Sequence, residues 1–154
     1  MEVTINEYEL IFSAEPIAIL DLYKQRKSNA PESGGIVLGK ILENKIHILK
    51  LSVPTELDKA SRMNFERHRL SAQIIINYEF FNSNGQITYL GEWHTHPEKY
   101  PSPSITDMRM IQKQFLENKI HTDFLLLLIQ GLNELYIAVF DKTGLSYMSY
   151  KNEI

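Results

Sequence analysis

Hydrophobic positions recur along the chain with helical spacing in two stretches, residues 69–81 and 104–118. The second stretch begins at Ser104, and serine is one of the residues that favour helix starts. A further helix is expected over residues 13–27, because Ser13 can cap it and a proline in its first turn suits a helix start. The pattern therefore predicts three helices.

Short apolar runs bounded by turn residues lie between these helices and predict strands. The expected strands cover residues 3–12 with one irregularity, 36–39, 45–49, 86–96, 123–130, 135–140 and 145–150. The second and third strands should form a hairpin across Glu43 and Asn44, whereas residues 54–63 are polar and irregular and should form a loop. The predicted fold class is α/β, with a mixed, largely antiparallel β-sheet flanked by helices.

Length and composition fit one globular unit. The chain has 154 residues, of which 44% are hydrophobic and 23% charged, and domains of about 100 to 150 residues are the most common. The sequence contains no internal repeat and no low-complexity segment. Residues 1–154 are therefore expected to form a single domain.

Charge and cysteine content exclude several classes of protein. The formal net charge is -3 and the basic residues are scattered, so nucleic acid is not expected as the main partner. The absence of cysteine excludes disulfides, thiolate zinc sites and a cysteine nucleophile, and leaves nitrogen and oxygen ligands for any metal. The sequence starts without a secretion signal, and no apolar run reaches the roughly 18 to 20 residues that span a bilayer. We therefore expect a cytoplasmic protein without membrane contact.

Two histidines separated by one residue are the most informative feature of the sequence. His94 and His96 fall at the end of the strand expected over residues 86–96, and side chains two residues apart on a strand project to the same face. Asp107 follows His96 after ten intervening residues, at the start of the helix expected over 104–118. Two histidines and one carboxylate would leave one coordination position open, as catalytic zinc sites do.

The same residues also have a purely structural interpretation. A His-x-His pair alone can be part of a core or a surface without binding any ion. Ser104 and Asp107 form the spacing of a capping box, in which both side chains only satisfy free N–H groups at a helix start. The two interpretations are compatible, because a capped helix start would hold the Asp107 carboxylate at a defined angle to the histidines.

Hydrolysis of a peptide bond also needs a group that takes a proton from water and passes it to the departing amine. A carboxylate is the usual choice. The candidates are Glu92 and Glu98, beside the two histidines, and Glu32, in the loop before the strand expected over 36–39. Glu92 shares the expected strand face of the two histidines, and it could be the base, a support for the site or an ordinary strand residue. The residues alone do not choose among the three.

Order and spacing of these residues resemble the JAMM motif of the MPN or JAB-domain metalloproteases. The stretch from Gly91 to Pro97, Gly-Glu-Trp-His-Thr-His-Pro, is followed by Pro103-Ser104 and then by Asp107. Upstream, the stretch from Pro31 to Gly39, Pro-Glu-Ser-Gly-Gly-Ile-Val-Leu-Gly, is similar to the segment that carries the catalytic glutamate of the family. No motif position departs from the family pattern.

The resemblance implies a role for each matching residue. His94, His96 and Asp107 would bind one catalytic Zn²⁺ ion, and Glu32 would act as general base and then as general acid. Ser104 would stabilise the oxyanion of the tetrahedral intermediate, which is physically reasonable for a hydroxyl donor beside a metal. The family also implies a β-sheet flanked by helices, in agreement with the hydrophobic pattern.

The resemblance also implies the class of substrate. JAMM enzymes hydrolyse the isopeptide or peptide bond after the C-terminus of ubiquitin or a ubiquitin-like protein, so the partner would be a protein with a flexible C-terminal tail. The amino-acid sequence of the motif and the short chain most resemble prokaryotic stand-alone JAB proteins. Some of these act in anti-phage CBASS systems, where a cyclic-nucleotide synthase is the conjugated protein. Deconjugation in such a system is the favoured interpretation, with residues 54–68 and 97–103 shaping tail recognition.

Three other functions fit the same residues. A JAB peptidase that processes a sulfur-carrier protein would have the same metal ligands. A non-catalytic MPN-like interaction module would keep the fold but not the chemistry. A phosphoesterase or amidase for small molecules would use the same metal, because an activated water does not choose its own electrophile.

Overall fold

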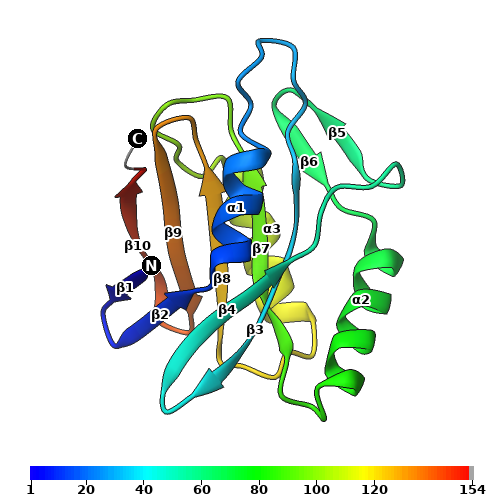
Figure 1. The fold of residues 1–154 in the computed structure, drawn as a ribbon, viewed down its shortest axis with the longest axis vertical. Helices are drawn as coiled ribbons and strands as arrows, with labels where there is room; N and C mark the ends of the chain where they lie inside the picture. Colours follow the sequence, from blue (N-terminus) through cyan, green and yellow to red (C-terminus); the bar gives the residue numbers. More distant parts are fainter. Residues whose placement is uncertain (153–154) are drawn as a thin grey trace.

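An eight-stranded mixed sheet forms the centre of the computed structural model, which describes residues 1–152 (Figure 1). Its spatial order is β1-β2-β4-β3-β7-β8-β9-β10. In this sheet β2 pairs with β4 and β7 with β8 in parallel, and the other neighbours are antiparallel. The strands are β1 (Glu2–Ile5), β2 (Tyr8–Phe12), β3 (Gly34–Leu42), β4 (Lys45–Leu51), β7 (Thr88–Thr95), β8 (Phe124–Gln130), β9 (Glu134–Asp141) and β10 (Gly144–Lys151). The predicted fold class is confirmed.

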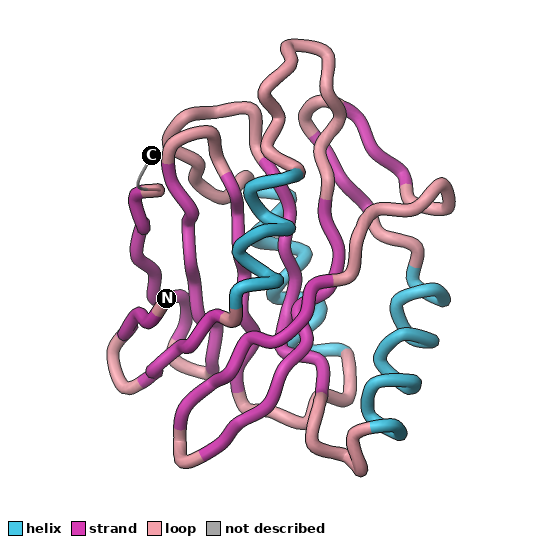
Figure 2. Tube along the Cα trace, in the orientation of Figure 1, coloured by secondary structure: helices cyan, strands magenta, loops and turns pink. Residues whose placement is uncertain are grey.

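Three helices cover the two faces of the sheet: α1 (Ala14–Leu22), α2 (Arg69–Asn82) and α3 (Ile105–Glu117) (Figure 2). Helix α1 packs on the face whose core includes Trp93 and Leu128. Helices α2 and α3 pack on the opposite face, where Ile111 of α3 is fully buried. None of the helices within residues 1–152 combines the length and apolarity that crossing a membrane requires.

The sheet curls so that its two ends approach each other. The Tyr8 hydroxyl donates a hydrogen bond of 2.7 Å to Asp141, and the Asn6 amide donates one of 2.8 Å to the hydroxyl of Ser146. These contacts join the N-terminal hairpin to β9 and β10. Strands β7 and β8 lie in the middle of the curled sheet, and all of their residues are buried.

A second, two-stranded sheet lies beside the C-terminal end of β7. It consists of β5 (Lys59–Ser61) and β6 (Asn64–Glu66), paired antiparallel. Phe65 of β6 lies against the start of β3, where a Cβ atom at Gly34 would overlap its ring. Glycine at this position therefore allows the small hairpin to approach the main sheet.

The structure corrects several predicted boundaries. The strand expected over residues 3–12 is two strands, separated by a turn in which Asn6 has a φ of 51°. Helix α1 ends at Leu22 instead of about residue 27, because the following segment leaves the helix to place Gln25 in buried hydrogen bonds. The loop expected over residues 54–63 contains β5, whose three exposed residues carry no apolar alternation.

The apolar spacing identified α2 but only part of the face that it buries. Of the apolar residues at that spacing, Ile75 packs against the core, whereas Leu70, Ile74, Tyr78 and Phe81 are exposed. Ala72 is also buried against the sheet. Helix α3 agrees better with the prediction. Its bounds lie close to the expected span of 104–118, and Ile111 is fully buried.

Candidate metal centre

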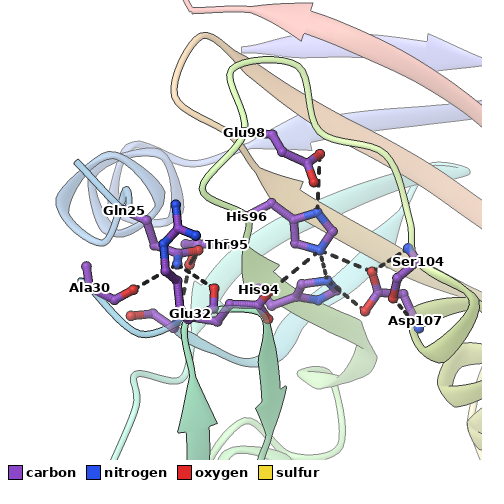
Figure 3. Close-up of polar contacts among 11 residues, drawn as sticks. Gln25, Ala30, Glu32, His94, Thr95, His96, Glu98, Ser104 and Asp107 are labelled. Atoms are coloured by element: carbon purple, nitrogen blue, oxygen red, sulfur yellow. Dashed lines mark hydrogen bonds and ion pairs between the residues drawn. The ribbon is translucent and has the colours of Figure 1, made fainter. Parts of the chain in front are cut away.

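His94 lies near the end of strand β7, and His96 follows directly after the strand, at the end of the sheet that faces α3 (Figure 3). His94 and His96 are 4% and 6% exposed, and their Nε2 atoms lie 3.2 Å apart. Thr95, between them, projects to the other side of the strand and is fully buried. The period of two that the sequence suggested therefore holds at this point, and both imidazoles face one location.

Asp107 completes this cluster from the first turn of α3. Its Oδ1 lies 3.1 Å from His94 Nε2, and its Oδ2 lies 3.1 Å from His96 Nε2. The capping box is also formed, because the Asp107 amide donates to Ser104 Oγ at 3.0 Å and the Ser104 amide donates to Asp107 Oδ2 at 2.8 Å. Asp107 thus caps the helix and also lies against both histidines, so the cap leaves its carboxylate beside the imidazoles.

The spacing of these atoms fits a small tetrahedral ion. Zinc binds imidazole nitrogen and carboxylate oxygen at about 2.0 to 2.2 Å, which places neighbouring ligand atoms about 3.3 Å apart in a tetrahedron. The observed separations of 3.1 and 3.2 Å are close to that value. The ligand atoms of His94, His96 and Asp107 are therefore spaced as a small tetrahedral ion such as zinc would need.

Glu32 lies on the other side of the histidines, in the loop that leads into β3. It is 4% exposed, and its Oε1 is 3.8 Å from His96 Nε2. Glu32, His94 and His96 also offer a ligand atom each within 4.8 Å of one another, so a second, overlapping triad could bind a metal. Asp107 is the nearer carboxylate, since it touches both nitrogens, and the longer distance of Glu32 suits a group that acts next to the ion.

Burial raises the pKa of Glu32 to about 7. The negative charges of Asp107 and Glu98 add to this shift, and His96 opposes it. A carboxyl with a pKa near neutrality can both accept and release a proton at physiological pH. This property matches the two proton transfers that a peptidase requires.

The charges of His96 and Asp107 stabilise each other. Burial opposes a charge on Asp107, but hydrogen bonds from His94 and His96 outweigh it and hold the pKa of the Asp107 carboxyl well below its usual range. Burial likewise opposes a charge on His96, but Asp107, Glu32 and Glu98 outweigh it and raise the pKa of this imidazole. The three carboxylates around His96 therefore favour a positive charge beside its ring.

The other two candidate bases have different surroundings. Glu92 is 4% exposed and accepts hydrogen bonds from Arg67 Nε at 2.8 and 3.0 Å and from the Tyr89 hydroxyl at 2.7 Å. Burial and the Glu92 carboxylate together raise the pKa of Tyr89 well above its usual value, so this hydroxyl stays a donor. Both Glu92 oxygens are thus engaged in structural contacts. Glu98 is half exposed and approaches the outer nitrogen of His96, with Oε2 3.9 Å from Nδ1.

A groove of about 760 Å³ leads from His94 and Asp107 into the space between α2 and α3. Tyr89 and Glu92 of β7 lie in its wall, and Phe65 of β6 lies near its opening beside the metal centre. Amide side chains line it: Gln73 and Asn77 of α2, Gln114 of α3, and Asn118 directly after α3. The groove connects the candidate metal centre with the surface.

A family model described as prokaryotic homologs of the JAB domain matches residues 18–140, and this span contains every residue of the cluster. The chain belongs to this family. The JAB resemblance of its motifs is therefore confirmed.

Three curated relatives support the same JAB assignment, and each is named CD-NTase/cGAS isopeptidase. The relative from Escherichia coli (strain TW11681) is 33% identical over 84% of this chain and 80% of its own length. The relative from Vibrio cholerae serotype O1 is 29% identical over 86% and 89%. The relative from Pseudomonas aeruginosa (strain BWHPSA011 / Pa011) is 32% identical over 90% and 87%.

A solved structure supports the JAB-like fold alone. The solution structure of protein DSY2949 from Desulfitobacterium hafniense superposes with a TM-score of 0.62 at 19% identity, over 90% of this chain and 89% of that protein.

Sequence reasoning missed Arg67 and left Glu92 without a role. The two residues are 25 positions apart, and Arg67 lies in a stretch without regular patterning. The one available signal was the position of Glu92 on a buried strand, because a buried carboxylate needs a partner.

Proposed function

We propose that this chain is a zinc-dependent isopeptidase that cleaves the bond after the C-terminal tail of a conjugated protein, with a cyclic-nucleotide synthase of the CD-NTase class as that protein. The three relatives named CD-NTase/cGAS isopeptidase support this substrate class. The proposed reaction is deconjugation in a CBASS system in the cytoplasm. The partner is therefore a protein tail, with no role for nucleic acid or membrane.

The observation that carries the proposal is the separation of two carboxylates by the histidine pair. Asp107 touches both Nε2 atoms at 3.1 Å, whereas Glu32 lies 3.8 Å from one of them and has a pKa raised by burial to about 7. This difference supports a division of roles in which Asp107 binds the ion and Glu32 moves protons. A binding module would have no need for this division.

We assign the steps of the reaction to the residues of the chain. Zinc bound by His94, His96 and Asp107 would supply Lewis acidity and lower the pKa of water at the site. Glu32 takes one proton from that water as the oxygen attacks the carbonyl carbon of the tail. Glu32 then gives the proton to the departing amine nitrogen as the C–N bond breaks, and Glu32 returns to its starting state.

We propose that Ser104 assists from the start of α3. Its oxygen accepts the Asp107 amide proton, which leaves its own hydroxyl proton free to be donated. We propose that the hydroxyl donates a hydrogen bond to the carbonyl oxygen of the substrate, which becomes negative during the attack. Capping and oxyanion stabilisation use different parts of the same hydroxyl.

The groove between α2 and α3 is the proposed path of the tail. It opens at His94 and Asp107, and the amide side chains of Gln73 and Asn77 can hydrogen-bond the backbone of an extended peptide. The stretches 54–68 and 97–103 flank the metal centre and are assigned to tail recognition. Exchanging the exposed side chains of these stretches, with Ser61, Arg62 and Arg67 kept, should change the preferred tail without changing zinc content.

Cleavage of a CD-NTase joined through its C-terminal tail to a second protein tests the proposal. The wild-type protein should release the second protein, and a chelator should stop the reaction. Glu32→Gln should bind one zinc per chain and cleave at least about 100-fold more slowly, because it lacks the proton acceptor. Mass spectrometry of the products identifies the bond that was cut.

Alternative substrates separate the competing functions. A sulfur-carrier fusion cleaved faster than the CD-NTase fusion would replace the proposed substrate with the sulfur-carrier one. Faster hydrolysis of small amides or phosphoesters would point to a small-molecule hydrolase. If the zinc-loaded protein cleaves none of these substrates but binds a CD-NTase, it is an interaction module.

A further inference from the structure

A buried polar network lies behind the metal centre, on the side of β7 opposite the histidines (Figure 3). Its central residue is Gln25, in the segment after α1, which is only 3% exposed. It is not part of the metal-binding motif, and within residues 1–152 its hydrogen-bond partners are two backbone carbonyls and the Thr95 hydroxyl. A buried glutamine needs partners for its amide, and the partners of Gln25 come from three separate segments.

Gln25 uses both ends of its amide. Its Nε2 donates to the carbonyl oxygen of Ala30 at 3.1 Å and to that of Arg62 at 3.0 Å. Its Oε1 accepts the hydroxyl proton of Thr95 at 2.9 Å. The side chain thus joins the loop before β3, the turn between β5 and β6, and strand β7.

Thr95 continues the network towards the catalytic loop. Its Oγ1 accepts a hydrogen bond from the Ser33 amide at 2.9 Å, and its own amide donates to the Ser33 carbonyl at 2.9 Å. The residue between the two histidines is therefore fastened to the residue after Glu32. The position of the histidines and that of the glutamate are fixed by one set of hydrogen bonds.

Glu32 is held on both sides by this arrangement. Ala30 is bound to Gln25, Ser33 is bound to Thr95, and the Glu32 amide donates to the Ser61 carbonyl at 2.7 Å. The segment that carries Glu32 has no helix or strand hydrogen bonds of its own. Its geometry depends on these contacts from outside the segment.

We propose that Gln25 and Thr95 are positioning residues, which hold the Glu32 carboxylate at its place beside His96. This inference rests on the proposed function, in which Glu32 transfers the proton. Glutamine is suited to the position because it donates two hydrogen bonds and accepts another, whereas a glutamate would face two carbonyl oxygens with negative charge. Loss of the network should move Glu32 without removing any metal ligand.

Gln25→Leu and Thr95→Val test the inference, because both keep the approximate volume of the side chain and remove its hydrogen bonds. For each we expect one zinc per chain, a KM within about threefold of wild type, and a kcat that falls on the order of 10- to 100-fold. Thr95→Ser keeps the hydroxyl and should retain most of the wild-type kcat. The matched control is Ser83→Ala, which removes two hydrogen bonds to the backbone, those with Phe80 and Ile87, near the other end of β7.

Hydrogen exchange of the Glu32 and Ser33 amides gives a readout that does not depend on activity. Exchange should be faster in Gln25→Leu and Thr95→Val, and unchanged in Ser83→Ala and Thr95→Ser. The inference is overturned if the kcat of both network variants stays within about threefold of wild type, or if Ser83→Ala loses as much. If Gln25→Leu does not fold, the comparison of Thr95→Val with Thr95→Ser decides.

Failure of the proposed function gives a different result. If the wild type cleaves no fusion, the isopeptidase proposal fails, and the exchange rates still report whether Gln25 and Thr95 hold the Glu32 loop. If the wild type cleaves and Glu32→Gln does not, but the network variants cleave normally, only the positioning inference fails.

Discussion

Ser104 has an observed structural contact and a proposed chemical one in the same hydroxyl group. Its oxygen caps α3 through the Asp107 amide, and we propose that its proton is donated to the substrate. Removing an N-cap side chain costs about 1 kcal/mol of stability, and removing an oxyanion donor costs about 100-fold or more in kcat. A substitution at this position therefore has two consequences that can be measured separately.

We expect Ser104→Ala to lower the free energy of unfolding by about 1 kcal/mol and kcat by about 100-fold. Ser104→Asp should regain the stability, because aspartate is also a good N-cap, but not the kcat, because an ionised carboxylate donates no proton. Denaturant unfolding and steady-state kinetics measure the two effects. Recovery of kcat in Ser104→Asp would exclude the hydroxyl as the oxyanion donor.

Glu98 provides a test of the choice among the candidate bases. It is half exposed and approaches His96 at Nδ1, whereas Asp107 and Glu32 approach Nε2. Glu98→Gln should therefore keep kcat within about threefold of wild type, in contrast to the loss of at least about 100-fold expected for Glu32→Gln. Equal losses in the two variants, measured with the same fusion, would remove the special role of Glu32.

At the scale of elements, a buried ion pair fastens the segment after β6 to the main sheet. Arg67 Nη2 lies 2.8 Å from Glu92 Oε1, and both side chains are largely buried. Arg67→Met should destabilise the fold by about 3 to 5 kcal/mol, because it leaves the Glu92 carboxylate buried without its cation. The double variant Arg67→Met, Glu92→Gln should regain part of this loss in denaturant unfolding. Additive losses would mean that the two side chains do not act as a pair.

The same elements show how far the sequence predicts the fold. Strands β8 and β9 and helix α3 were predicted to within about two residues, because their apolar patterns are set by local periodicity. The hairpin β5–β6 was not, since its short exposed strands have no such pattern. The early end of α1 depends on Gln25, whose partner Thr95 is 70 residues away.

The candidate site follows a similar rule. His94, His96 and Asp107 lie on a strand and a helix start, where spacing along the chain fixes direction in space, and the structure brings them together. Glu32 lies in a loop and could be named only through its resemblance to a family. The contacts of Glu92 with Arg67 and of Thr95 with Gln25 join segments that are far apart in the sequence. The local pattern of apolar and polar residues therefore does not predict them.

For the whole molecule, we propose that residues 1–154 unfold as one unit. The contact of Tyr8 with Asp141 joins β2 to β9, and β7, which carries the proposed metal ligand His94, lies in the middle of the sheet. An ion that binds only the folded state stabilises it by mass action, by about 2.7 kcal/mol at 100 times its dissociation constant. Zinc should thus raise the midpoint of a single thermal transition by about 5 to 10 °C.

This shift also decides which carboxylate binds the ion. If Asp107 is the third ligand, Asp107→Ala and His94→Ala should abolish the zinc-dependent rise in Tm, and Glu32→Gln should keep it. If Glu32 is a ligand, as the alternative triad with His94 and His96 allows, Glu32→Gln should lose the rise as well. The distances favour the first outcome, because both Asp107 oxygens lie at 3.1 Å from a histidine nitrogen and Glu32 lies at 3.8 Å. Calorimetry of each variant with and without zinc separates the two ligand sets. The Tm without zinc reports how stable the variant itself is, and the rise in Tm on adding zinc reports whether it still binds the ion.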